Sequence, residues 1–206
     1  MLILKSVLST MIVLSTVLSL QSGVIKVSNE QQNDSDYYQD VVYIKQWNSV
    51  TDEQRYYFDV EVKAAAVGLS VKDYKFFRDV VECESVGGDN IEDRILVACT
   101  IINRVNDGRF GKSLFEILTR PGQFHCVTQD EETEEYKVAG SGSLESEWAI
   151  IEAYRRVADG TVPTDMLYFN SIGFDKHKFD YAYVGGNYYS TETPNEFTDL
   201  TVTEED

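Results

Sequence analysis

The most regular hydrophobic pattern of the chain lies in residues 71–105. Tyr74, Phe77 and Val81 recur at the three- and four-residue spacing that places side chains on one face of an α-helix. Glu84 falls on the same face, because it follows Val81 by three residues. Two glycines then end the predicted helix, since glycine readily takes the left-handed conformation of a helix C-terminus. The pattern predicts an amphipathic helix whose last turn carries an acid on its apolar side.

A second helix is predicted directly after this glycine turn. Either Asp89 or Asn90 is a suitable N-cap, and the turn that follows is acidic, as the helix dipole favours. Residues 95–102 are nearly all apolar, so this helix is expected at the centre of the fold. It is expected to end at Asn103 and Arg104, before a polar turn.

Shorter elements complete the pattern. Ser113 and Ser143 are predicted to cap two further helices, and Leu144 and Tyr154 are expected on the buried side of the second of these. The acidic run at residues 130–135 predicts an exposed hairpin or flap. Residues with β-propensity form the short segments 166–169 and 179–184, and a glycine turn separates them from 188–189. We therefore expect an α+β fold that is mostly helical with a small β element.

The length of 206 residues suits one domain with extensions. Residues 1–22 are predicted to be a signal peptide or, if uncleaved, a membrane anchor, because a lysine precedes a short apolar run. Residues 23–48 are predicted to be a flexible polar stalk, residues 49–190 the folded domain, and residues 191–206 a disordered acidic tail.

Charge and composition exclude several classes of function. A net charge of −17 without a basic cluster excludes nucleic acid as a partner, because phosphate binding needs clustered Lys and Arg. Three cysteines are too few for a disulfide framework, and two histidines give no zinc-ligand spacing. We expect no metal and no cofactor, a monomer, and membrane contact only through an uncleaved N-terminal segment.

Glu84 is the strongest candidate for catalysis. An acid at the C-terminal turn of a helix meets the negative end of the helix dipole, and apolar neighbours desolvate it. Both effects favour the protonated carboxyl group that a general acid requires. The alternative is that Glu84 is an ordinary solvent-facing acid. Glu82 lies on the opposite, polar face of the same helix.

Five motifs in order resemble the SleB-type cell wall hydrolase family of spore cortex-lytic enzymes. They are VECESVGG at residues 81–88, the apolar helix that closes in Asn103-Arg104-Val105, Arg109-Phe110, Pro121-Gly122-Gln123-Phe124, and Leu167-Tyr168-Phe169. The resemblance covers about residues 71–189. It departs from the family at Gly111, where a proline is common, and at Asn187, where a histidine is common.

The resemblance implies a lysozyme-like domain, secreted or attached to the cell envelope, whose partner is the glycan strand of peptidoglycan. It implies cleavage between N-acetylmuramic acid and N-acetylglucosamine, by lytic transglycosylation or hydrolysis. The family's catalytic acid maps best onto Glu84, with Glu82 as the alternative mapping, and the position of Glu84 on the apolar face favours Glu84. The expected substrate-binding residues are Gln123, Phe124, Asn103, Tyr168 and Phe169. The alternative for the three aromatic residues is burial in the core. The alternative for Asn103 and Arg104 is capping the helix and pairing with Glu92 or Asp93.

Two other functions remain open from the sequence. The first is a cysteine peptidase or amidase with Cys126 as nucleophile and His177 as base, although nothing around Cys126 resembles the helix N-terminus that activates such a thiol. The second is a non-catalytic exported protein that binds the wall.

Overall fold

The computed structural model describes residues 42–85, 90–172 and 181–191. Several predictions lie outside these residues: the export segment, the stalk up to residue 41, the glycine turn at 87–88, His177, and the tail from residue 192. Residues 42–48, at the end of the predicted stalk, are helical. Within the described residues, no helix combines the length and the apolar character needed to cross a membrane.

Of the helices that follow, three begin at the predicted caps Asn90, Ser113 and Ser143. In chain order the helices are α3 (Asp52–Tyr56), α4 (Val60–Ala66), α5 (Val71–Glu84), α6 (Ile91–Asp107), α7 (Leu114–Leu118) and α8 (Leu144–Ala158). Ser70, Asn90, Ser113 and Ser143 each accept a hydrogen bond from a backbone amide in the first turn of α5, α6, α7 and α8. These caps satisfy amides that a helix N-terminus otherwise leaves unpaired.

Helix α6 is longer than the sequence pattern predicts. It continues past Arg104 to Asp107 and ends at Gly108, whose φ of 77° is the left-handed conformation of a C-cap. The polar pair Asn103 and Arg104 does not break the helix, because both side chains are buried and bonded to other parts of the chain. The predicted end was therefore wrong by about one turn.

The strands form two small antiparallel sheets. A hairpin pairs β1 (Val127–Gln129) with β2 (Tyr136–Val138), and its tip holds the predicted acidic run. The second sheet has the order β3-β5-β4 and consists of β3 (Tyr168–Asn170), β4 (Ala182–Val184) and β5 (Asn187–Ser190). Within it Phe169 pairs with Tyr189, and Tyr183 pairs with Tyr188. The prediction of a mostly helical α+β fold is confirmed.

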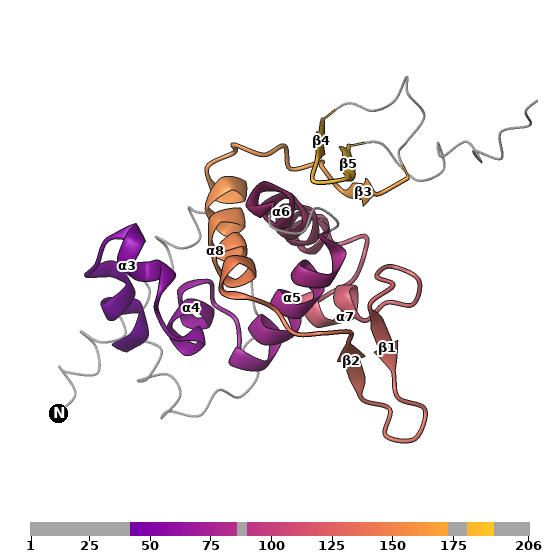
Figure 1. Cartoon of the computed structure of the whole chain (residues 1–206), viewed down its shortest axis with the longest axis horizontal. Helices are drawn as coiled ribbons and strands as arrows, with labels where there is room; N and C mark the ends of the chain where they lie inside the picture. Colours follow the sequence, from indigo (N-terminus) through magenta and orange to yellow (C-terminus); the bar gives the residue numbers. More distant parts are fainter. Residues whose placement is uncertain (1–41, 86–89, 173–180, 192–206) are drawn as a thin grey trace, which may run out of the picture.

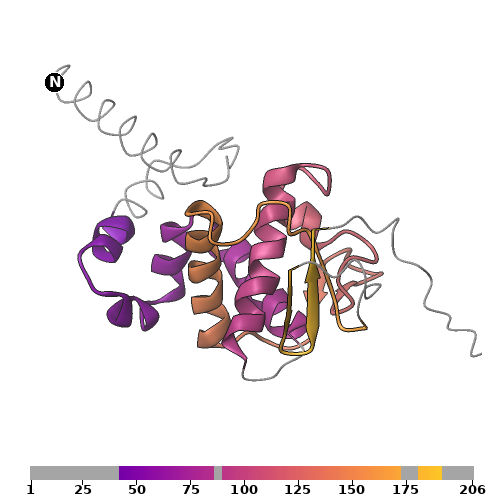
Figure 2. The same ribbon diagram turned by 90° about the horizontal axis from the view of Figure 1, so that it is seen from above.

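Helix α6 lies at the centre of the domain, as predicted. It packs along α8 on one side, the three-stranded sheet lies on its other side, and α4 packs beyond α8 (Figures 1 and 2). Every residue of α6 from Asp93 to Arg104 is buried. The hairpin β1–β2 projects from the end of the domain where α5 and α7 meet (Figure 1). The prediction that Leu144 is buried was wrong: it is 47% exposed, because it opens α8 beyond the end of the core.

Candidate active site

Glu84 is the last residue of α5, and two contacts hold it in place. Its side chain is half-buried, and its Oε1 accepts a hydrogen bond from the thiol of Cys126 at 3.2 Å. Its backbone carbonyl accepts a second bond from Nδ2 of Asn187 at 3.1 Å. The helix places Glu84 here because Val80 and Val81, one turn earlier, are fully buried. The carboxylate therefore lies at the border between the core and the surface.

Cys126 serves the site as a protonated thiol. It is 6% exposed, and burial together with the hydrogen bond to Glu84 raises the pKa of the Cys126 thiol. A thiol in this setting stays protonated at neutral pH and donates a hydrogen bond to Oε1 of Glu84. The loop that follows α7 thus delivers a hydrogen-bond donor to the end of α5.

Glu82, the other candidate acid, is engaged in a different network. Its carboxylate accepts hydrogen bonds from Arg94 at 2.9 Å and from the hydroxyls of Ser143 and Ser146. Burial opposes its ionisation, but these bonds outweigh burial and lower the pKa of Glu82 to about 2. Glu82 therefore joins α5 to α6 and to the first turn of α8. A carboxylate held ionised by a cation is poorly suited to donate a proton.

Arg104 is a buried cation behind the site. Its Nε donates to the backbone carbonyl of Leu167 at 2.7 Å, and its Nη1 donates to Oε1 of Gln123 at 3.3 Å. The guanidinium also lies over the ring of Phe110, 5.1 Å from its centroid. Burial lowers the pKa of Arg104 to about 10, and the charge of Glu84 acts in the opposite direction. Arg104 therefore remains a cation at neutral pH.

Gln123 lies at the edge of this cluster. Its side chain is partly exposed, and its orientation follows from Arg104, which has only donors and so selects the amide oxygen. Among the described residues, its Nε2 has no hydrogen-bond partner. Arg104 thus holds the amide oxygen of Gln123, while the amide nitrogen is available to a ligand.

Phe124 and Asn103 lie in the interior rather than on the surface. Phe124 is 3% exposed and packs under the guanidinium of Arg104. Asn103 is 1% exposed and donates to the carbonyls of Pro163 and Met166. The sequence-based alternative of pairing with Glu92 or Asp93 is wrong for both Asn103 and Arg104, whose bonds go to the segment before β3 and to the loop after α7.

The two aromatic residues of β3 differ in exposure. Tyr168 is buried and meets the ring of Phe110 edge-on at 6.0 Å. Phe169 is half-buried and stacks on Tyr189 with centroids 5.9 Å apart. Phe169 also lies near the guanidinium of Arg104, so it is the aromatic residue of β3 that retains surface next to the site.

A buried network under Glu84 was not predicted from the sequence. Nδ2 of Asn187 donates both to the carbonyl of Glu84 and to Oδ1 of Asp93, at 3.1 and 3.2 Å. The hydroxyl of Tyr189 donates to the same Asp93 oxygen at 2.7 Å, and burial together with this negative charge raises the pKa of Tyr189. The only sequence signal was an acid at the start of an otherwise apolar helix.

Gly185 allows the strands to approach this network closely. Its φ is +61°, and a Cβ at this position would lie 2.5 Å from the Cβ of Asp93. Glycine is therefore required in the turn between β4 and β5. In the part of the chain that the structure describes, no group of three or more His, Cys, Asp or Glu residues is placed to hold a metal ion.

The comparisons agree with the motifs. Residues 88–184 match the sequence model of the family described as Cell Wall Hydrolase. The match contains Asn103, Arg104, Gln123, Phe169 and the Cys126 loop, and it begins four residues after Glu84. Comparison with curated proteins and with solved structures found no match. Residues 88–184, just under half of the chain, are therefore similar to the cell wall hydrolase family, as the motifs indicated.

Proposed function

We propose that this protein cleaves the bond between N-acetylmuramic acid and N-acetylglucosamine in peptidoglycan, with Glu84 as its general acid and base. The observation that carries the proposal is the contrast between two acids on one helix. Glu82 is ionised and bonded to Arg94, whereas Glu84 forms no ion pair among the described residues and accepts only a thiol bond. Of these two acids, Glu84 is the one whose carboxyl group is not paired with a cation.

In the proposed mechanism Glu84 acts twice. Its protonated carboxyl group first donates a proton to the glycosidic oxygen as the bond to the muramoyl carbon breaks. The resulting carboxylate then takes a proton from the 6-hydroxyl of the muramoyl residue, whose oxygen closes a 1,6-anhydro ring. If water attacks instead, the same carboxylate takes the proton of water, and the product has a reducing end. Because Cys126 bonds to Oε1, we assign the proton transfer to Oε2.

The positions of Gln123 and Phe169 suit them to hold the sugar. The open Nε2 of Gln123 can donate to the carbonyl of an N-acetyl group, while Arg104 fixes the other end of the amide. Phe169 keeps part of an aromatic face beside the same guanidinium. Phe124, Asn103 and Tyr168 are buried, so in this proposal they position Arg104 and β3 rather than contact the sugar.

Peptidoglycan lies outside the cytoplasmic membrane, so the enzyme needs to be exported. The family points to an extracellular or envelope location. We propose that residues 1–22 direct the export and that the protein works as a monomer in or near the wall.

The cysteine peptidase alternative has less support. A nucleophilic cysteine needs a lowered pKa, whereas the pKa of Cys126 is raised by burial and by Glu84. Its proposed partner His177 lies outside the described residues. Iodoacetamide separates the two possibilities: we expect it to modify the exposed Cys83 while wall cleavage continues.

The test of the function uses purified peptidoglycan, the full chain and two variants. We expect the wild type and Glu53→Gln, a change at an exposed acid of α3, to release muropeptides at similar rates. Glu84→Gln should lower the rate at least about 1,000-fold while its thermal unfolding stays close to the wild type. Mass spectrometry of the products separates anhydro ends from reducing ends, which are heavier by one water. Release of the same fragments by Glu84→Gln would overturn the assignment, and no release by the wild type would favour a wall-binding protein.

A further inference from the structure

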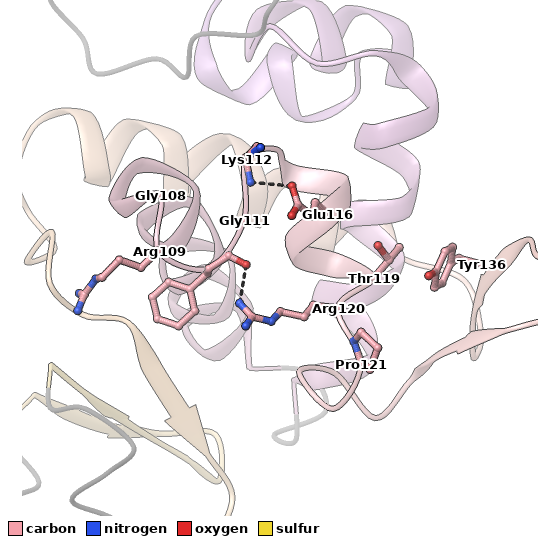
Figure 3. A pocket seen from close by; sticks show the side chains of 10 residues that line it. Gly108, Arg109, Gly111, Lys112, Glu116, Thr119, Arg120, Pro121 and Tyr136 are labelled. Atoms are coloured by element: carbon pink, nitrogen blue, oxygen red, sulfur yellow. Dashed lines mark hydrogen bonds between the residues drawn. The ribbon is translucent and has the colours of Figure 1, made fainter.

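A surface groove opens between the end of α6 and the hairpin. It has a volume of about 560 Å³ (Figure 3). Its walls come from the end of α6, from α7, from the loop after α7 and from β2. The lining residues that matter here are Phe110, Lys112, Glu116, Arg120, Pro121 and Tyr136.

The groove carries positive charge on a strongly negative protein. The chain has a net charge of −17, yet Arg109, Lys112 and Arg120 all line the groove against one acid, Glu116. Arg109 is paired with Asp107 at 2.6 Å. Lys112 and Arg120 form no ion pair with any residue in the described ranges, and Arg120 donates only to the backbone carbonyl of Phe110, at 3.0 Å. Two exposed cations are therefore available to an anionic ligand.

One loop connects the groove to the proposed catalytic acid. Pro121 lines the groove, Gln123 binds Arg104, and Cys126 donates to Glu84. Phe110 makes a second connection, because it lines the groove while its ring lies against the Arg104 guanidinium. The groove and the proposed catalytic acid are therefore joined by the single short loop of residues 121–126.

We propose that this groove binds the peptide stem of a muramoyl residue, an inference that rests on the proposed function. The backbone of the glycan strand is uncharged, and the carboxylates of peptidoglycan belong to its peptide stems. Lys112 and Arg120 can receive these carboxylates. Oε2 of Glu116 accepts a hydrogen bond from the backbone amide of Lys112 at 2.8 Å. The Glu116 carboxylate can also pair with the side-chain amine of the diamino acid in a peptide stem.

The mixed charges of the groove favour a peptide over an anionic wall polymer. A phosphodiester chain carries only negative charge, so Glu116 would repel it. A stem carries both signs within a few residues, which matches two cations and one acid. The ring of Tyr136 and the hydroxyl of Thr119 add apolar and hydrogen-bonding surface of the kind that short peptides use (Figure 3).

The test measures binding and cleavage of strands with and without stems. Removal of a stem by an amidase also frees the lactyl carboxylate of its muramoyl residue, so both strands are anionic and a preference for one of them reports the peptide. Full-length Glu84→Gln is mixed with glycan strands that carry stems and with the same strands after an amidase has removed them. We expect the stem-bearing strands to bind at least about tenfold more tightly, and Lys112→Ala/Arg120→Ala in the same background to abolish that difference. Lys72→Ala/Lys75→Ala removes the same charge from the exposed face of α5 and should leave the difference intact.

Each outcome bears on a separate claim. Equal binding of the two strands would overturn the stem site, and so would an equal loss of the binding difference in the Lys72→Ala/Lys75→Ala control. In either case, cleavage of peptidoglycan by the wild type would still support the proposed function. Tighter binding to strands that carry an anionic phosphodiester polymer, whether or not they carry stems, would also overturn the stem site. If the Glu84→Gln protein binds neither strand and the wild type cleaves neither, the proposed function fails and the stem site fails with it. For the active enzyme, we expect Lys112→Ala/Arg120→Ala to raise KM and leave kcat nearly unchanged.

Discussion

The thiol of Cys126 donates a hydrogen bond to Oε1 of Glu84 across 42 positions of sequence, at 3.2 Å. The contact joins the end of α5 to the loop after α7. It makes Cys126 a positioning residue for the proposed catalytic acid.

Removing this donor should slow catalysis without unfolding the protein. Cys126→Ala leaves Oε1 of Glu84 without its partner, and we expect kcat to fall about 5- to 10-fold, the value of one hydrogen bond. Cys126→Ser keeps a donor of similar size and should retain most of the activity. The measurement is the rate of muropeptide release at saturating peptidoglycan. Equal rates for the Ala and Ser variants would show that the thiol does not position Glu84.

Glu82 should matter for stability rather than for chemistry. Its pKa of about 2 lies below the usual 4.5, so its stabilising effect is complete above pH 4.5 and is lost as the pH falls from 4.5 towards 2. We expect Glu82→Gln to lower the free energy of unfolding by about 1–3 kcal/mol near neutral pH, and this difference to shrink over that interval. Urea unfolding at several pH values measures it. Loss of activity in folded Glu82→Gln would reassign the catalytic acid.

Asn187 should affect kcat through the backbone of Glu84. Asn187→Ala removes the bonds to the Glu84 carbonyl and to Asp93, and we expect it to lower kcat about tenfold with little change in KM. It should also cost about 1–3 kcal/mol of stability. Asn103→Ala is the comparison, because it also removes two hydrogen bonds of a buried amide. If kcat falls no further in Asn187→Ala than in Asn103→Ala, Asn187 has only a structural role.

Gly185 should be intolerant of a side chain. Gly185→Ala combines a positive φ with a Cβ that would meet Asp93, and Gly160→Ala imposes a similar φ of +74° with nothing within 4 Å. The control should lose about 1 kcal/mol of stability, and Gly185→Ala about 1–3 kcal/mol more. Thermal unfolding of both variants measures the difference. Equal losses would mean that the turn between β4 and β5 shifts to make room.

The helices were predictable because their signals are local. Ser70, Asn90 and Ser143 cap helices whose apolar residues repeat within a few positions, so each element could be recognised without its neighbours. Glu84 was placed on the buried side of α5 by the same spacing. Its role in catalysis stays a prediction, as does sugar contact by Gln123 and Phe169.

The contacts around Glu84 were not predictable because they join distant segments. Asn187 and Tyr189 meet Asp93 from 94 and 96 positions away. Spacing along α6 also could not show that the Asn103 side chain bonds inside the protein, since that depends on where the segment before β3 packs. Phe124 lies in the loop after α7, where no periodicity indicates which way a side chain points. The exposure of Leu144 has the same origin, because periodicity does not tell where the core ends.

The bond between Asn187 and Glu84 spans 103 positions, so nearly the whole domain must be synthesised before the end of α5 acquires its anchor. A nascent or truncated chain that stops before β5 has the acid but not its support. The geometry of the proposed catalytic acid therefore depends on a nearly complete domain, because the residue that anchors the end of α5 comes from its last strand.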